Sequence, residues 1–535
     1  MSFRKFIAAA GLATVLAISG QAQAQQGFEP SLRQIQADMY FLADDAMLGR
    51  MPGEPGYDIA ANYVAARFRA LGLQPGGDNG SYHQSVPLLR FRAADDGRLT
   101  LTGADGSTEV LTPRVDYVAG SNPLSETTNV SAPLVFAGYG IVGAGRDDYA
   151  GLDVRGKIVV VLSSAPMGLQ TEERAHVADA SFKRRTAEAR GAVGMVVVYP
   201  GRAGEPEAFA QRTTIDRTMT WRNPQGRTGY GGDGAPYLAG FGRAGAEKLF
   251  AGSDLSVEEI WAAAATPEGR VGSGELRTRL SAELRNTLTD IPSANVVGII
   301  PGSDPEVADE YIILSAHVDH IGTRSMGEGD RINNGFVDNS SGVAAMLEAA
   351  RGFMETSPPR RSVMFIGLTA EEQGLVGADY YANNPTVPLE QIAANVNLDM
   401  PVLTYDFSDV VVFGANRSSI GPSIERAGAR IGIGVAEDFL PEEGLFTRSD
   451  HYRFVVVGVP SVFLMTGPGN GGREAFADFL RTHYHRPGDQ PDLPISWDAA
   501  LRFASLNYQI ARELADQPER PSWNEGDFFN PETHR

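Results

Sequence analysis

From about residue 293 onward, short apolar runs alternate with amphipathic segments, and this alternation is the strongest constraint on the fold. The runs ANVVGIIPG, EYIILSAH and SVMFIGLT are typical of strands, and SSGVAAMLEAARGFME, which lies between the last two, is typical of a helix. Strands that alternate with helices in this way form α/β domains with a largely parallel sheet. We therefore expect an α/β domain over residues 286–515, closed by a helix in WDAALRFASLNYQIARELAD.

The chain has 535 residues, which is too long for one ordinary compact domain. Residues 25–125 begin with two segments whose apolar residues recur at helical spacing; the first follows Ser31, a predicted N-cap, and the second ends at a glycine. Residues 126–285 contain Val- and Ile-rich runs between glycine-bearing turns, which predicts a compact β-rich insertion. Residues 516–535 are polar, and we expect this tail to pack poorly.

The first 24 residues differ from the rest of the chain. Arg4 and Lys5 precede an apolar run of about 12 residues, and Ala22-Gln23-Ala24 follows as an A-x-A cleavage site. The run is too short to span a bilayer. Residues 1–24 are therefore predicted to be a signal peptide, and the protein to be exported to a periplasm or secreted, with no stable membrane insertion after cleavage.

Composition argues against nucleic-acid binding and limits the residues that could hold a metal ion. The formal charge of −20 becomes −22 when the two positive charges of Arg4 and Lys5 leave with the signal peptide, and so acidic a chain is a poor nucleic-acid binder. The chain has no cysteine, so a metal ion would be held by histidines and carboxylates.

The predicted strands end in residues that bind metals. His317 ends one strand, the pair Glu371-Glu372 follows another, and Asp399 follows a third. Asp338 precedes a predicted helix, and His485 lies on a loop. Because ligands of open α/β sheets bind at the carboxyl ends of strands, these side chains are expected to meet. Histidines and carboxylates without cysteine suit catalytic zinc or a harder divalent ion.

Seven motifs over about 290–515 resemble those of the co-catalytic di-zinc aminopeptidases, a family with relatives among glutamate carboxypeptidases and the transferrin receptor. They are SAHVDHIG, GFVDNSSG, TAEEQG, NLDM, TRSDHYRF, GVPSVFLMTG and YHRPGD. The resemblance implies a three-layer α/β/α zinc-exopeptidase domain with a mostly parallel central sheet, of which residues 25–125 are the N-terminal part and residues 286–515 the catalytic part. PLVFAGYGI and DDYAGLDVRGKIVVV are similar to the protease-associated (PA) domain often inserted in this family, over residues 126–285.

Carried over residue by residue, the resemblance makes Asp338 a carboxylate that bridges two zinc ions. His317 and Asp399 would complete the coordination of one ion, and Glu372 and His485 that of the other. Two cations held close together need a shared anion, and a carboxylate has two oxygens to share. The resemblance thus implies two Zn²⁺ per chain, although the ligand set alone would also tolerate cobalt or manganese.

The neighbour of a ligand, Glu371, is then the general base. Glu371 directly precedes the ligand Glu372 but is not itself a ligand, so it can reach the bridging water without losing its lone pairs to zinc. Asp319 is expected to hydrogen-bond His317 and fix its tautomer. Tyr484 resembles the tyrosine that polarises the substrate carbonyl in this family.

Other residues carry weaker expectations. Arg448, in TRSDH, is predicted to contact the substrate, with an ordinary surface arginine as the alternative. His320 and His451 are interpreted as supporting or structural groups. Relatives also imply a non-proline cis peptide bond before Asn339.

The predicted function is an exported di-zinc aminopeptidase that acts on peptides with a free amino terminus. Its insertion would flank the cleft and limit access, or contribute to a homodimer. One alternative is a carboxypeptidase, dipeptidase or amidohydrolase of the same superfamily, for which the Arg-rich stretch RTTIDRTMTWRNPQGRTGY could recognise a carboxylate. The other is a receptor-like binding protein without catalysis. Against the latter, all five ligand positions that the resemblance implies are filled, and the base is present.

Overall fold

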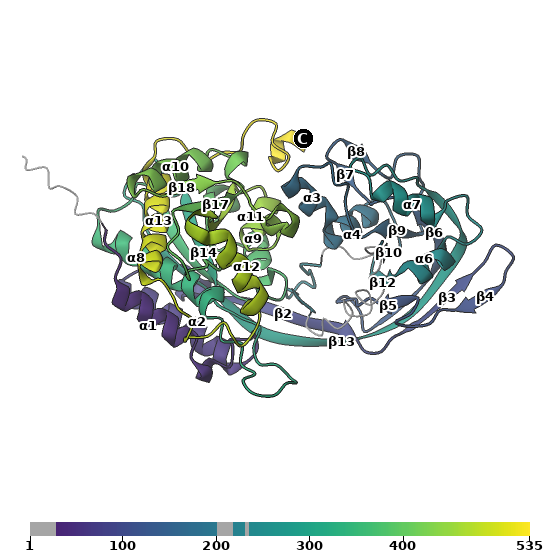
Figure 1. The fold of residues 1–535 in the computed structure, drawn as a ribbon, viewed down its shortest axis with the longest axis horizontal. Helices are drawn as coiled ribbons and strands as arrows, with labels where there is room; N and C mark the ends of the chain where they lie inside the picture. Colours follow the sequence, from purple (N-terminus) through teal and green to yellow (C-terminus); the bar gives the residue numbers. More distant parts are fainter. Residues whose placement is uncertain (1–27, 201–217, 231–234, 535) are drawn as a thin grey trace, which may run out of the picture.

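The computed structural model describes residues 28–200, 218–230 and 235–534. These residues form two lobes, which we call the α/β lobe and the insertion lobe (Figure 1). The predicted signal peptide, residues 1–24, lies outside the described residues. Within the part that is described, no helix has both the length and the apolar character needed to cross a membrane.

One strand joins the two lobes. Strand β13 (Gly274–Ile300) is 27 residues long and curves along the base of the molecule (Figure 1). Residues 274–285 pair within the sheet of the insertion lobe, and residues 286–300 pair within the sheet of the α/β lobe. The two lobes therefore share a continuous backbone element.

The sheet of the α/β lobe has a parallel centre and antiparallel edges. From edge to edge it consists of β11 (Thr218–Trp221), β2 (His83–Ala93), β13, β15 (Ser362–Leu368), β14 (Tyr311–His317), β16 (Ile392–Leu398), β19 (Ser461–Thr466), β17 (Asp409–Phe413) and β18 (Gly434–Ala436), and β1 (Gln74–Pro75) pairs with β13 beyond the end of β2. Strands β15, β14, β16 and β19 run parallel to their neighbours in this group. Every residue of β15, β16 and β19 is buried, as expected for strands covered on both faces.

Helices cover both faces of this sheet, which confirms the predicted three-layer fold. One face packs on α1 (Leu32–Leu42), α2 (Pro55–Leu71), α8 (Gly342–Glu355) and α13 (Trp497–Asp516), with α10 (Ile420–Arg430) against α13. The other packs on α9 (Val376–Asn383) and α11 (His451–Val456). Helix α12 (Gly472–Thr482) belongs to the same lobe. As predicted, Ser31 caps α1 by accepting the N–H of Gln34, and α2 ends at Gly72 in the left-handed conformation.

The insertion lobe has its own sheet and apolar cores. In order, its strands are β4 (Thr108–Val110), β3 (Arg98–Thr102), β13, β6 (Thr127–Phe136), β9 (Ile158–Leu162), β10 (Gly194–Val198), β12 (Tyr237–Phe241) and β5 (Tyr117–Ala119), and a hairpin pairs β7 (Val142–Gly143) with β8 (Arg146–Asp147). Its helices are α3 (Thr171–Ala178), α4 (Ala180–Glu188), α6 (Arg243–Leu249) and α7 (Val257–Ala264).

The sequence boundary at 285 coincides with the point where β13 passes from one sheet to the other, but the boundary at 125 and the assignment of all of 126–285 to the insertion differ from the structure. Strands β3, β4 and β5 precede residue 126 but pair in the insertion sheet, and β11 lies within 126–285 but pairs with β2 in the α/β sheet. Sheet pairing is a long-range contact, so a change of composition along the chain does not mark it.

The C-terminal tail corrects the expectation of poor packing. Phe529 is 8% exposed and packs in the core of the α/β lobe, and the neighbouring Phe528 packs against both lobes. Trp523 donates its ring N–H to the carbonyl of Gly458 at 2.8 Å. These three aromatic side chains outweigh the polar composition of the tail.

Candidate metal centre

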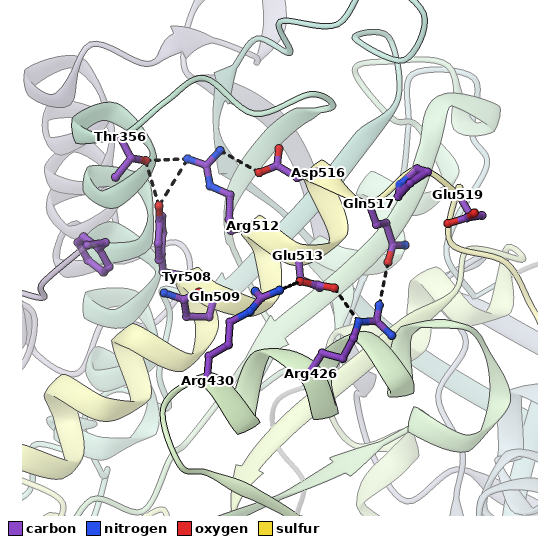
Figure 2. A pocket seen from close by; sticks show the side chains of 12 residues that line it. Thr356, Arg426, Arg430, Tyr508, Gln509, Arg512, Glu513, Asp516, Gln517 and Glu519 are labelled. Atoms are coloured by element: carbon purple, nitrogen blue, oxygen red, sulfur yellow. Dashed lines mark hydrogen bonds and ion pairs between the residues drawn. The ribbon is translucent and has the colours of Figure 1, made fainter. Parts of the chain in front are cut away.

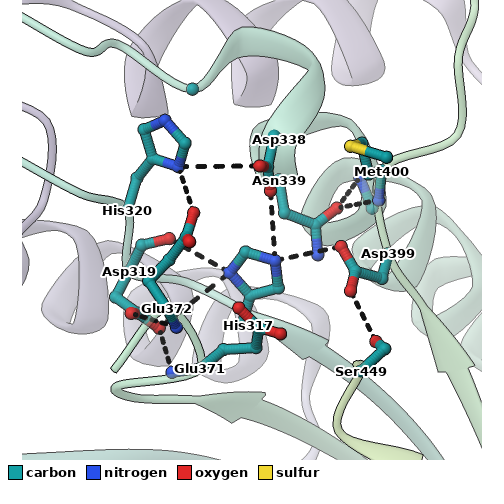
Figure 3. Close-up of polar contacts among 12 residues, drawn as sticks. His317, Asp319, His320, Asp338, Asn339, Glu371, Glu372, Asp399, Met400 and Ser449 are labelled. Atoms are coloured by element: carbon teal, nitrogen blue, oxygen red, sulfur yellow. Dashed lines mark hydrogen bonds and ion pairs between the residues drawn. The ribbon is translucent and has the colours of Figure 1, made fainter. Parts of the chain in front are cut away.

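The parallel strands bring the predicted residues together at their carboxyl ends, on one side of the sheet (Figure 3). His317 is the last residue of β14, and the loops after its neighbours β15 and β16 carry Glu371-Glu372 and Asp399. Asp338 lies in the turn that precedes α8, and His485 lies on the loop after α12. The strand-end rule therefore assembles the candidate site from segments far apart in the chain.

The first donor cluster combines one histidine with two aspartates. Nε2 of His317 lies 3.0 Å from Oδ1 of Asp399 and 3.3 Å from Oδ1 of Asp338. All three residues are buried, and their donor atoms lie within 4.8 Å of one another. A divalent ion among them would find one nitrogen and two oxygens, which suits catalytic zinc.

The second cluster lies on the other side of Asp338. Nε2 of His485 lies 2.9 Å from Oε2 of Glu372 and 3.3 Å from Oδ2 of Asp338. Asp338 thus turns one carboxylate oxygen toward each cluster. The peptide bond between Asp338 and Asn339 is cis, as predicted.

The protonation equilibria of these groups are strongly coupled to their surroundings. Burial alone would lower the pKa of His317, but the carboxylates of Asp399 and Glu371 outweigh it and raise that pKa well above its ordinary value. Burial likewise opposes the effect of Glu372 and Asp338 on His485, whose pKa rises to about 10. The carboxylates thus favour positive charge at the carboxyl ends of these strands, and metal ions would supply it.

Glu371 has a different environment from its neighbour. Burial raises the pKa of Glu371 well above that of an ordinary glutamate, and the negative charges of Asp399 and Glu372 add to the effect. For Glu372, the pKa falls to about 2, because the histidines His485 and His320 outweigh burial and the repulsion from Asp338. The pKa values of the adjacent glutamates are therefore shifted in opposite directions, so that Glu371 favours the protonated form and Glu372 the charged form.

Asp319 holds the site differently from the expectation. Nδ1 of His317 lies 3.1 Å from the backbone carbonyl oxygen of Asp319, and 3.9 Å from its carboxylate. The carboxylate instead accepts the backbone N–H of Glu371 at 3.1 Å and of Glu372 at 3.3 Å. Asp319 thus orients His317 through its main chain and the glutamate pair through its side chain.

Several supporting residues were missed from the sequence. Asp489, the last residue of YHRPGD, is fully buried and accepts the N–H groups of Val337 at 2.8 Å and Asp338 at 3.0 Å. Ser449, in TRSDH, donates to Oδ2 of Asp399. Both lie inside motifs that the sequence had singled out, so a search of those motifs for buried polar residues could have found them.

Tyr484 and Arg448 lie at the rim of the site. The ring of Tyr484 stacks on that of His485, with centroids 3.8 Å apart. Burial raises the pKa of Tyr484, and Asp338 and Glu372 raise it further, so the phenol remains protonated and able to donate a hydrogen bond. The half-exposed guanidinium of Arg448 pairs with Glu443 at 3.1 Å.

A surface pocket of about 640 Å³ between α10 and α13 lies apart from these donors (Figure 2). It carries three arginines, but Arg426 and Arg430 both pair with Glu513. The third arginine, Arg512, pairs with Asp516 one turn further along α13. The pocket therefore offers paired charges rather than an anion site.

The chain matches known peptidases in sequence and fold. The sequence pattern of peptidase family M28 matches residues 295–511. Probable leucine aminopeptidase 2 of Aspergillus fumigatus is 29% identical over 212 residues, which cover 36% of this chain and 39% of that protein. A probable zinc metalloprotease of Pyricularia oryzae is 30% identical over 263 residues, covering 42% and 50% of the two chains. The chain therefore spans half or less of these curated relatives.

A solved structure extends the likeness of the fold to both lobes. The aminopeptidase from Aneurinibacillus sp. strain AM-1 is 18% identical, with a TM-score of 0.50, and the alignment covers 92% of this chain and 95% of that one. The family match includes the strands that deliver His317, Glu372 and Asp399 and the loop that carries His485. Residues 295–511, which include all five predicted metal ligands, are thus similar to peptidase family M28.

Proposed function

We propose that this protein is an exported di-zinc aminopeptidase that removes N-terminal residues from peptides. The observation that supports this most is the position of Asp338, which turns one oxygen toward His317 and the other toward His485. Each cluster also has a carboxylate of its own, and Glu371 lies beside them. This arrangement fits two divalent ions that share one carboxylate.

His317, Asp338 and Asp399 would hold one zinc ion, and Asp338, Glu372 and His485 the other. Bound there, the pair would supply the Lewis acidity that activates water and polarises a carbonyl group. The buried carboxylates of Asp319 and Asp489 accept hydrogen bonds from backbone N–H groups of the site and so fix the proposed ligands before substrate arrives.

Glu371 moves the proton in the proposed reaction. Its raised pKa suits a carboxylate that accepts a proton from the attacking water and keeps it until the peptide bond breaks. The water oxygen bonds to the scissile carbonyl carbon, the carbon–nitrogen bond breaks, and Glu371 returns the proton to the leaving amine. The Tyr484 phenol donates a hydrogen bond to the carbonyl oxygen as negative charge develops on it.

In the proposed reaction, the free α-amine of the substrate binds in its neutral form at the metal-bearing end of the pocket. The charges of Asp338, Glu372 and Asp399 there are balanced by the two zinc ions that they would hold. The Arg-rich stretch raised for the carboxypeptidase alternative lies partly outside the described residues. Within the described part, Arg222 pairs with Asp290 at 2.6 Å, which occupies its charge away from the donors.

Export and the PA domain belong to the same proposal. Export is supported by the composition of residues 1–24. A protease-associated role for the insertion lobe is supported by its separate core and its place beside the α/β lobe (Figure 1). In this role the lobe would limit access to the site or contribute to a homodimer.

The first test is hydrolysis of aminoacyl chromogenic amides and of their N-acetylated forms by the wild-type chain, with and without chelator. We expect cleavage of the free-amine substrates only, lost with chelator and restored by zinc. Glu371→Ala should lower kcat by about 10²- to 10⁴-fold and leave the zinc content unchanged. Cleavage of neither form, with zinc still bound, would contradict the aminopeptidase proposal, and N-blocked peptides with a free carboxylate would then test the carboxypeptidase alternative.

A further inference from the structure

His320, the second histidine of HVDH, has no role in the five-ligand pattern. It is fully buried, and its Nδ1 lies 2.6 Å from Oε1 of Glu372 and 3.9 Å from Oδ2 of Asp338. Figure 3 shows its imidazole directed at the same two carboxylates. His485 approaches those carboxylates too, and the two histidine rings lie 5.8 Å apart at 73°. His320 therefore adds a nitrogen to the second cluster.

The contact between His320 and Glu372 is a close ion pair that lacks good hydrogen-bond geometry. Within the part of the chain that the structure describes, neither ring nitrogen of His320 has a hydrogen-bond partner, and neither does Oε1 of Glu372. Yet Nδ1 and Oε1 are only 2.6 Å apart. Two buried polar atoms at this distance, poorly aligned to share a proton, are better satisfied by a common cation than by each other.

The set of donors also matches what a cation requires. Nδ1 of His320, a carboxylate oxygen of Glu372 and one of Asp338 all lie within 4.8 Å of one another. His485 contacts the same two carboxylates from the rim. Two imidazole nitrogens and two carboxylate oxygens are sufficient for a tetrahedral zinc site.

We propose that His320 is a fourth protein ligand of the second metal ion, bound through Nδ1. The inference rests on the proposed metal centre. It makes the two positions unequal, because the first has the three protein donors of His317, Asp338 and Asp399. The second position would have one protein donor more than the first, and zinc can expand to five-coordinate, so both would still have room for a shared water. Because of its additional donor, the second position should bind zinc more tightly and fill first.

The direct test is a crystal structure of the wild-type chain loaded with zinc, with the ions located by their anomalous signal. We expect Nδ1 of His320 at about 2.0–2.1 Å from the second ion. Two ions with His320 more than about 3 Å from both would overturn the assignment, leaving the proposed function intact. A wild-type chain that binds no zinc would overturn both.

A zinc titration against a competing chelator tests the inference in solution. We expect two steps for the wild-type chain, and we expect His320→Gln to weaken the tighter step by roughly 100-fold or more and to leave the other in place. The matched control is His451→Gln, since His451 is also fully buried and packs between Phe446 and Phe463. A His320→Gln titration that superimposes on those of the wild type and the control would contradict the proposal.

Discussion

Arg50 connects the loops that carry the metal donors. It is 1% exposed and donates from Nε to the carbonyl of Val318, and from its terminal nitrogens to those of Leu42, Asn334 and Gly335. Burial lowers the pKa of Arg50 to about 10, although nearby aspartates oppose the shift, so the side chain stays charged at neutral pH. Because only a guanidinium presents this many donors in a fixed fork, one side chain sets the spacing of several loops.

We expect Arg50→Met to lower the free energy of unfolding by about 3–5 kcal/mol, because it leaves several buried carbonyl groups unpaired. Arg50→Lys should recover part of that stability but bind zinc more weakly, since an ammonium group cannot hold all the loops at once. Chemical denaturation of the chelator-treated chains, followed by zinc titration, measures both effects. Arg33→Met, at an exposed position of α1, should change stability by less than about 0.5 kcal/mol. Equal stability of the Arg50→Met and Arg33→Met chains would refute this account.

At the scale of elements, the strands that bear the site could be predicted because each is a continuous apolar run that ends in a metal-binding residue. β15, with the sequence SVMFIGL, is the clearest case, since Glu371 and Glu372 come only two residues after it. Strand β13 could not be predicted as one element. Its alternating first part and apolar last part are typical of two different strands, because it crosses from one sheet to another. Sequence periodicity reports which faces are buried, not whether the same strand continues.

The proposed metal ligands could be singled out from the sequence for a similar reason, and the residues that support them could not. His317 and Asp399 are recognisable by chemical type and by position at strand ends. Arg50 and Asp489 bind backbone groups that are distant in sequence, and a hydrogen bond to a backbone carbonyl or N–H imposes no pattern on the residue that supplies that group. The same limit applies to Asp319, whose backbone carbonyl holds His317.

Helix α4 contains a buried lysine whose ionisation should affect the insertion lobe. Lys183 is 1% exposed and donates to the carbonyls of Leu162 and Ser164, both at 2.6 Å. Burial lowers its pKa from 10.5 to about 7, with nearby aspartates opposing the shift. Between these two pH values the unfolded chain binds more protons than the folded chain at this residue, so the contribution of Lys183 to stability rises with pH.

We therefore expect wild-type stability to increase relative to that of Lys183→Met from about pH 7 to pH 9.5, by up to about 1.4 kcal/mol per pH unit. Urea denaturation at several pH values gives the difference. Lys157→Met is the control, because Lys157 pairs with the exposed Glu275 on the surface of the same lobe. Curves for wild type and Lys183→Met that remain parallel over this range would rule out the buried titration.

At the scale of the whole molecule, the lobes are joined by side chains as well as by β13. Nδ1 of His176, on α3, lies 2.7 Å from the hydroxyl of Tyr452 on α11. Glu172, also on α3, accepts the N–H of Gly414 at 3.1 Å. The loop that carries Arg448 meets the same helix, since Arg174 donates to the carbonyl of Pro441 at 3.4 Å. Contact with the insertion lobe thus helps to set the rim of the candidate active site.

Arg417 is at the centre of this contact. It belongs to the α/β lobe, is 6% exposed, and pairs with Glu172 of α3 and with Asp527 of the tail, the latter at 3.1 Å. Its guanidinium also lies 4.8 Å from the ring centroid of Phe529. One cation therefore joins two lobes and the tail, and removing it leaves two poorly exposed carboxylates without their partner.

We expect Arg417→Met to destabilise the contact by about 3–5 kcal/mol, so that calorimetric unfolding of the two lobes separates into two transitions. The KM for aminoacyl amides should rise more than kcat falls, because the rim that carries Arg448 loosens while Glu371 and the metal donors keep their places. Arg426→Met removes a half-exposed arginine whose partner Glu513 keeps its pair with Arg430, and it should change stability by less than about 1 kcal/mol. If Arg417→Met unfolds in one transition at the wild-type temperature, the lobes are held together by β13 and apolar packing alone, and the substrate rim does not depend on this ion pair.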